Sequence, residues 1–228
     1  MTRRGVARAA LGAAWVAAIV LLLGLGTWQV QRRAWKLDLI ARVDARIHAA
    51  PVPAPRDAGP DDAYRRVVAS GTYLTGKDTL VQASTVRGPG WWVMTPLRTK
   101  DGALLINRGY VADRRAPPAP PRPVTVTGLL RPTEPEGGFL RNNDPAADRW
   151  YSRDVAAIGR RDGVALAPYF IDADDAANAP GQPVGGLTVV SFRNSHLVYA
   201  ITWYTLAIMT AAGFLYWVAL VRRKAGRA

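Results

Sequence analysis

Cysteine is absent from this 228-residue chain, and histidine occurs only twice, as His48 and His196. The lack of cysteine excludes disulfides, thiolate zinc sites, thiolate-held iron–sulfur clusters and a cysteine nucleophile. Two histidines so far apart in the sequence also exclude the paired-histidine zinc motifs of metalloproteases.

The sequence motifs of soluble enzymes are missing as well. There is no glycine-rich phosphate loop and no G-x-S-x-G nucleophile elbow. Gly24 and Gly26 lie inside an apolar run, where glycine favours close approach of a second helix. Several carboxylates occur without a spacing that singles out an acid–base pair (Asp113, Asp148, Asp154 and Asp172). We therefore expect a protein that is not an enzyme.

Acidic residues are absent from both ends of the chain. All 17 acidic residues lie within 38–175, although the net charge of the whole chain is +13. The excess of basic residues flanks two apolar runs, which is typical of segments that contact anionic lipid headgroups. We expect membrane lipids as partners and no nucleic acid.

Two uncharged runs, 9–31 and 197–221, are long enough to cross a membrane. A bilayer core about 30 Å thick needs roughly 20 helical residues. A signal peptide is the alternative for the first run, but that run exceeds the usual apolar length of about 7–15 residues. A buried helix of a soluble protein is the alternative for the second run. We predict transmembrane helices at 9–30 and 196–221.

The basic tail, residues 222–228, predicts the orientation of the chain. Short basic segments stay in the cytoplasm, so two spans also place residues 1–8 there. The basic "QRRAWK" after the first run argues locally against this, but long segments translocate largely regardless of charge. We expect residues 51–195 to be extracytoplasmic. Because so few residues precede the first run, we expect a bacterial cytoplasmic membrane.

The middle of the chain favours strands. Residues 31–50 predict an amphipathic extension of the first helix, which ends before Pro51. Short strand-like runs follow, and "TKDG" between two of them predicts a hairpin. The predicted strands are 64–74, 78–85, 90–99, 103–112, 122–131, 168–174 and 186–190, with a short helix within 151–163. The predicted fold is membrane α+β, with two transmembrane helices flanking an extracytoplasmic, mainly antiparallel β domain.

The outer ends of the two predicted spans combine an imidazole with aromatic rings and a guanidinium. Helical spacing groups Trp28, Arg32 and Trp35 on one face, and His196, Tyr199 and Trp203 on another. An imidazole can ligate heme iron, aromatic rings can cover the macrocycle, and Arg32 can pair with propionates. The alternative is that these side chains are ordinary interfacial anchors.

Three stretches, "LGLGTWQVQRRAWK", "LLINRGYV" and "HLVYAITWY", occur in this order. Together they resemble the surfeit locus protein one family of cytochrome c oxidase assembly factors. The resemblance covers nearly the whole chain. It departs from the family at Ser195, where asparagine is frequent in the family.

The resemblance implies oxidase assembly rather than catalysis. It implies heme a as a transient cargo, passed to cytochrome c oxidase subunit I, with heme a synthase as a further partner. His196 matches the histidine that the family is proposed to use as its heme contact. A scaffold that binds nascent oxidase subunits without heme is the alternative. Within the Asn107–Val111 motif, we expect Gly109 to form a turn or bulge and Arg108 to pair with Asp113 or with a partner's carboxylate.

Overall fold

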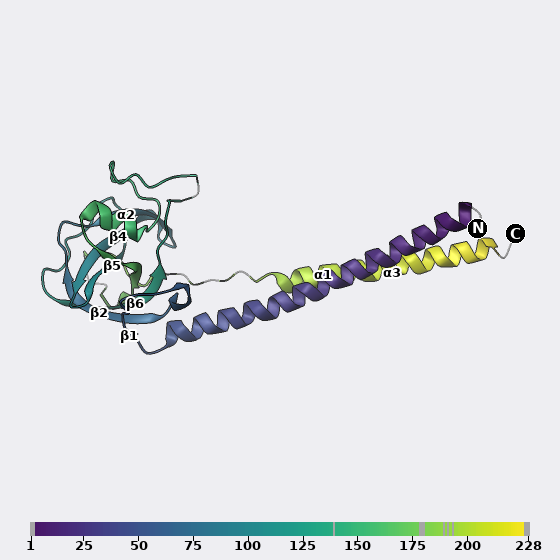
Figure 1. The fold of residues 1–228 in the computed structure, drawn as a ribbon, viewed down its shortest axis with the longest axis horizontal. Helices are drawn as coiled ribbons and strands as arrows, with labels where there is room; N and C mark the ends of the chain where they lie inside the picture. The colour runs from purple at the N-terminus through teal and green to yellow at the C-terminus, as the bar shows by residue number, and fades with distance from the viewer. Residues whose placement is uncertain are drawn as a thin grey trace. The chain divides into compact units, whose positions relative to one another are not determined.

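The computed structural model describes residues 3–138, 140–177, 181–188, 190, 192 and 194–225. The chain divides into two compact units (Figure 1). One unit joins residues 1–42 to residues 191–228, and the other contains residues 43–190.

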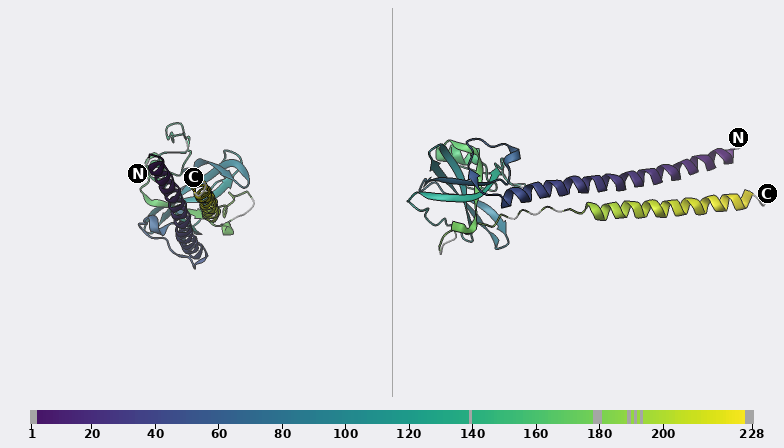
Figure 2. Two further views of the ribbon diagram at one scale, coloured as in Figure 1. Left: turned by 90° about the vertical axis from the view of Figure 1, so that its right-hand side faces the viewer. Right: turned by 90° about the horizontal axis from the view of Figure 1, so that it is seen from below.

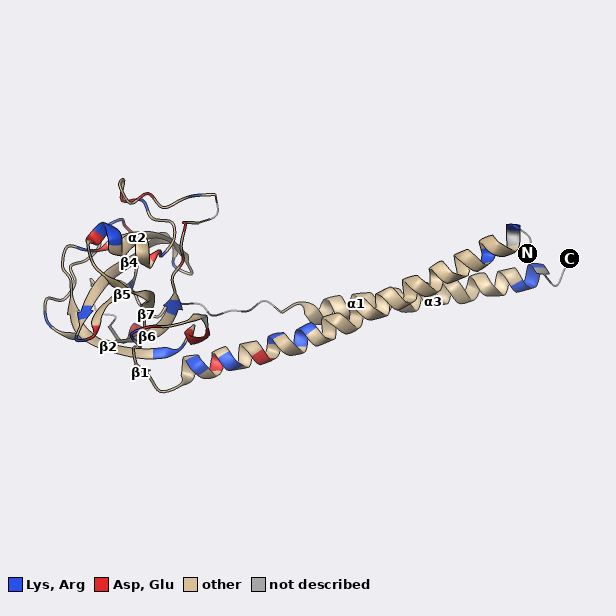
Figure 3. Cartoon of the chain, in the orientation of Figure 1, with Lys and Arg blue, Asp and Glu red and all other residues tan. Residues whose placement is uncertain are grey.

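The first unit is a pair of long helices. α1 runs from Arg3 to His48 without a break, and α3 runs from His196 to Ala225. Both are long and apolar enough to cross a membrane, judged by length and composition. The uncharged parts of both helices lie side by side, and the basic residues of α3 gather at its C-terminal end (Figures 2 and 3). α1 continues through the predicted extension and ends ahead of Pro51, as a proline-rich segment requires.

The second unit is a small mixed β-barrel with seven strands in one sheet. The strands are β1 (Val52–Pro53), β2 (Arg66–Tyr73), β3 (Thr79–Thr85), β4 (Gly88–Thr99), β5 (Gly102–Val111), β6 (Val124–Pro132) and β7 (Leu166–Ala173). Their order is β1-β2-β6-β7-β5-β4-β3, and pairing of β2 with β4 closes a five-strand ring. The β5–β7 and β1–β2 pairs are parallel and the others are antiparallel, so the domain is mainly antiparallel as expected.

Local sequence explains most of the strand boundaries. The β4–β5 hairpin turns at Lys100 and Asp101, within the predicted "TKDG" turn, and Thr99 pairs with Gly102. β5 is buried over almost its whole length, which accounts for its continuous apolar run. Six of the seven predicted strands are confirmed. β1 and the short 3-10 helices Pro60–Asp62 and Asp175–Ala177 were not predicted.

The predicted strand at 186–190 is wrong for the residues that the structure describes. Gly186–Thr188 and Val190 form no strand, and Val189 lies outside the described residues. The segment instead crosses the barrel as an irregular strap, defined here as residues 184–188. Val184 and Tyr110 exchange two backbone hydrogen bonds of 2.9 Å, and Gly186 N donates to Ala173 O at 3.0 Å.

Two apolar clusters hold the barrel unit together. One fills the barrel with buried side chains that include Val67, Leu97, Ile106, Leu130 and Ile171. The other packs α2 (Val155–Asp162) against the outer side of the sheet around Trp150, Ile158 and Phe170. α2 lies within the predicted range 151–163, and it begins after Asp154 because the Asp154 side chain accepts a hydrogen bond from Ala157 N at 2.9 Å.

Candidate functional site

α1 and α3 contact each other along one face of each helix and run antiparallel. Near the chain ends, the Trp15 ring lies 6.4 Å from the Phe214 ring, centroid to centroid. Further along, Gly26 faces the ring of Tyr204, and a Cβ at Gly26 would lie 2.7 Å from Tyr204 Cε1. Gly26 therefore permits close helix approach, as the sequence predicted, whereas Gly24 faces open space.

His196, the first residue of α3, contacts α1 directly. Its Nδ1 lies 2.7 Å from Oε1 of Gln29. A neutral imidazole that donates from Nδ1 to a carboxamide oxygen keeps the lone pair of Nε2 for another partner. His196 is half-buried and presents one nitrogen that is suited to ligate a metal.

The other predicted site residues differ in their exposure to solvent. Trp28 is 54% exposed and Tyr199 is 53% exposed, whereas Trp203 is half-buried. The guanidinium of Arg32 stacks 4.0 Å from the ring of Trp35, so these two side chains share a face as predicted. Trp28 and Gln29 are adjacent and so point about 100° apart around α1. The aromatic face of α1 therefore adjoins the face that contacts His196 rather than coinciding with it.

Gln29 contacts α3 but is not indicated by the spacing of the aromatic residues. The contact face of α1 is marked by half-buried or buried residues at helical intervals, including Trp15, Leu22, Gly26, Gln29 and Arg33. A glycine followed three residues later by a glutamine, both inside an apolar run, is the signal that could have found this face.

Two residues before His196, one side-chain atom has no hydrogen-bond partner among the described residues. The buried Oδ1 of Asn194 forms no hydrogen bond within the described part of the chain. A buried acceptor without a donor costs about 1–3 kcal/mol, so such an atom favours a ligand or water that donates a hydrogen bond. An imidazole nitrogen can ligate iron, and aromatic rings can lie against the apolar faces of a macrocycle, so these two kinds of group fit a heme. Within the described residues, no group of three or more His, Asp or Glu side chains is arranged to hold a metal ion.

The Asn107–Val111 motif lies in the barrel and shapes its wall. Asn107 pairs with Met94 and Tyr110 pairs with Trp92, so one β4 residue faces two β5 residues and β5 bulges at Arg108 and Gly109. Gly109 has φ 128°, and a Cβ there would lie 2.4 Å from the backbone of Val184. The predicted bulge at Gly109 is confirmed, and it makes room for the strap.

Arg108 does not pair with Asp113, so that expectation is wrong. The bulge directs the Arg108 side chain inward, where it is 4% exposed and its Nη1 lies 3.4 Å from Asp78 Oδ1. It also donates to the carbonyls of Pro117 and Pro118 and to Gln182 Oε1. Arg108 therefore ties the proline-rich loop to the barrel.

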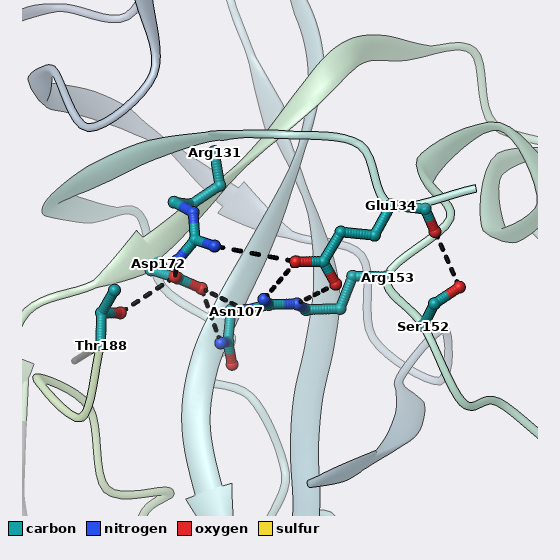
Figure 4. A network of polar contacts seen from close by, with 7 residues as sticks. All are labelled: Asn107, Arg131, Glu134, Ser152, Arg153, Asp172 and Thr188. Atoms are coloured by element: carbon teal, nitrogen blue, oxygen red, sulfur yellow. Dashed lines mark hydrogen bonds and ion pairs between the residues drawn. The ribbon is translucent and has the colours of Figure 1, made fainter. Parts of the chain in front are cut away.

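Asp172 of β7 is the centre of a buried polar network (Figure 4). Its side chain is 2% exposed and accepts hydrogen bonds from Asn107 Nδ2 at 2.8 Å and Thr188 Oγ1 at 2.9 Å. It also accepts hydrogen bonds from the guanidinium groups of Arg131 at 3.0 Å and Arg153 at 3.2 Å. The network joins the Asn107–Val111 motif to the strap, and no spacing in the sequence indicated it.

Glu134 balances the second charge of this network. It accepts hydrogen bonds from Arg153 Nε at 2.9 Å and Nη2 at 2.5 Å, and lies 3.7 Å from Arg131 Nη2. Burial opposes the charge of Arg153, but the hydrogen bond to Glu134 and the charge of Asp172 raise the Arg153 pKa above its usual value. Two carboxylates and two guanidinium groups thus neutralise each other inside the domain.

Comparison with known proteins identifies the family. Residues 16–208 match the SURF1 family model. The chain is 36% identical to Surfeit locus protein 1 of Rattus norvegicus over 228 aligned residues, which cover 89% of this chain and 73% of the rat protein. It is also 36% identical to Surfeit locus protein 1 of Homo sapiens, covering 84% of this chain and 72% of the human protein. A SURF1-like protein of Monosiga brevicollis is 35% identical to this chain, and the alignment covers 91% of this chain and 85% of that protein.

The matched region includes α1 from Val16, the whole barrel domain and the first half of α3, and so contains both His196 and the Asp172 network. This chain belongs to the SURF1 family, a family of cytochrome c oxidase assembly factors.

Proposed function

We propose that this chain is a membrane-bound assembly factor for heme–copper cytochrome c oxidase that holds heme a and passes it to oxidase subunit I. It acts by binding and transfer, without catalysing a reaction. Family membership supports the assembly role, and the heme role rests on the helix-paired imidazole described above.

The observation that carries the heme proposal is the 2.7 Å contact between His196 Nδ1 and Gln29 Oε1. In the tautomer with the proton on Nδ1, Nε2 of His196 would be free to ligate the iron of a bound heme. Trp28, Tyr199 and Trp203 would cover the macrocycle, and Arg32 would pair with propionates. A single protein ligand suits a cargo that has to leave for another subunit.

The proposed location is a bacterial cytoplasmic membrane, crossed twice. Two apolar helices and the short basic end of α3 support cytoplasmic termini and an extracytoplasmic barrel. Heme a would enter from a synthase in the bilayer, and membrane lipids would contact both helices. Reporter fusions test this orientation: a fusion in the 114–123 loop should be active outside the cytoplasm, and a fusion after Ala228 should be inactive there.

Purification from cells that make heme a tests the cargo. The wild-type chain should co-purify with heme and show a Soret band. His196→Ala should lose the band while keeping its circular dichroism spectrum. His48→Ala is the matched control, because His48 lies exposed at the end of α1 with its Nδ1 2.9 Å from the Asp44 carbonyl. A chain that never carries heme would refute the proposal.

The second candidate is a scaffold that binds nascent oxidase subunits without heme. Exposed apolar side chains in loops of the barrel domain favour it, since Val86 is 81% exposed and Leu140 is 88% exposed. Under this alternative, Val86→Ser and Leu140→Ser would reduce co-purification of subunit I, whereas His196→Ala would leave it unchanged.

A further inference from the structure

We propose that Gln29 is a positioning residue for His196: it holds Nδ1, directs Nε2 toward the ligand, and is kept in register by Tyr204 lying on Gly26. The role of Gln29 in heme binding rests on the proposed function. The tautomer of His196 rests only on the geometry of the paired helices.

The first step is the pairing of the two side chains. Gln29 and His196 are 167 residues apart in sequence, and both are half-buried where α1 and α3 meet. A hydrogen bond in such surroundings is stronger than in water, and a buried amide without a partner is costly. Each side chain therefore fixes the rotamer of the other.

The second step is the choice of nitrogen. A carboxamide oxygen accepts and cannot donate, so its contact with Nδ1 favours the tautomer that carries the proton on Nδ1. Metal-ligating histidines generally donate their other N–H to such an acceptor, which sets the ring orientation. Gln29 stands in this relation to His196, with Nε2 left as the ligating atom.

The third step is the strength of the acceptor. A neutral carboxamide polarises the imidazole less than a carboxylate would, so Nε2 remains a weaker electron donor to iron. Glutamine at position 29 therefore favours release, whereas glutamate would favour retention. This difference suits a carrier rather than an enzyme with a resident heme.

The fourth step is the register of the helices. Tyr204 lies against Gly26, and its hydroxyl is 3.1 Å from Oγ1 of Thr27. Thr27 Oγ1 also donates to the carbonyl of Leu23 at 2.9 Å. A Cβ at Gly26 would lie 2.7 Å from the Tyr204 ring, so a larger side chain there would displace that ring and disturb the close approach of the helices. The contact therefore sets where His196 meets Gln29, less than one turn from Gly26.

The test uses the scarcity of histidine in this chain. A His48→Ala background leaves His196 as the single imidazole, so ¹⁵N-histidine labelling of the full-length chain in lipid nanodiscs gives one pair of ring signals. Heme-free protein should show the Nδ1–H tautomer. Gln29→Leu and Gly26→Val should shift the signals toward the Nε2–H tautomer that free neutral imidazole prefers. Gln31→Leu, a change of the same type on an exposed position of α1, should leave them unchanged.

Titration with ferric heme a then reads the consequence for binding. Loss of an outer hydrogen-bond partner typically weakens metal affinity about 10–100-fold, so Gln29→Leu should fall in that range. Gln29→Glu should bind more tightly and lower the heme reduction potential. Gln31→Leu should match the wild-type chain in both measurements.

The outcomes separate the two proposals. If Gln29→Leu keeps both the Nδ1–H signals and wild-type affinity, the positioning role is refuted. If the wild-type chain binds no heme a but shows the Nδ1–H tautomer, the proposed function fails while the Gln29–His196 pair stands. Each variant must give the same circular dichroism spectrum as the wild-type chain. If Gln29→Leu does not fold, Gln29→Asn takes its place.

Discussion

The buried network around Asp172 predicts a large loss of stability when its central carboxylate is removed. Asp172→Ala deletes the acceptor of four hydrogen bonds, two of them from guanidinium groups. Removing one partner of a buried ion pair costs about 3–5 kcal/mol, because the other charge stays buried. Glu134 still faces both guanidinium groups after the change, so we expect the lower end, about 3 kcal/mol.

This loss is measurable as a shift in unfolding temperature. At about 2–4 °C per kcal/mol for a chain of this size, the midpoint should fall by about 6–12 °C. Near-ultraviolet circular dichroism of the detergent-solubilised full chain follows the packing of its aromatic side chains, including the buried Trp150 of the barrel domain, during heating. Asp113→Ala is the control, because the exposed Asp113 has no side-chain partner among the described residues and should change stability by less than about 0.5 kcal/mol. Equal midpoints for the two variants would show that the network does not stabilise the domain.

Three further predictions concern the barrel domain and use the same thermal assay. Gly109→Ala should lower the unfolding midpoint more than Gly102→Ala. Both glycines have a positive φ, but only Gly109 faces the strap backbone. Similar losses in the two variants would contradict the role of the bulge. Asp154→Ala should lower the free energy of unfolding by about 1 kcal/mol because it removes the N-cap of α2, whereas Asp154→Asn should be nearly neutral. An unchanged midpoint for Asp154→Ala would show that the cap is dispensable. Burial raises the pKa of Tyr73 from 10.0 to about 12. Between these two pH values the Tyr73 phenol has lost its proton in the unfolded chain but keeps it in the folded domain. The free energy of unfolding should therefore fall as the pH rises through this range. Tyr73→Phe should reduce this alkaline loss, and an equal pH dependence in the variant would refute the assignment.

Local patterns in the sequence were sufficient for elements that depend on neighbouring residues. Uncharged length predicts α1 and α3, "TKDG" predicts the β4–β5 hairpin, and the glycine of the Asn107–Val111 motif predicts a bulge. The parallel β5–β7 pairing joins residues more than 60 positions apart and has no local signal. The strand prediction at 186–190 was wrong because "GLTVV" has strand-forming residues. The strap is held by a bridge at Val184 and by hydrogen bonds at Gly186 and Thr188 instead of a strand ladder over its described residues.

The candidate site was harder to predict than the fold. Helical spacing correctly placed Arg32 and Trp35 on one face of α1, but the aromatic residues mark a different face from the one that contacts α3. Gln29 lies on that contact face because the small Gly26 lets the helices approach, and this depends on Tyr204 far along the chain. The partner of Arg108 was missed for a similar reason, since the bulge reverses the direction in which its side chain points.

Ring closure of the barrel limits how another polypeptide can be recognised. β2, β4, β5, β6 and β7 have a neighbour on both sides, and in the described part of the chain only β1 and β3 border the sheet. β1 has two residues, and the outer side of β3 is partly covered where Gln82 N donates to the Trp150 carbonyl. Strand addition by a newly made subunit is therefore disfavoured, and so is self-association edge to edge. Under the proposed function, an oxidase subunit would be selected by loop side chains, so exchanging loops between relatives should transfer the preference for a subunit while the sheet is left intact.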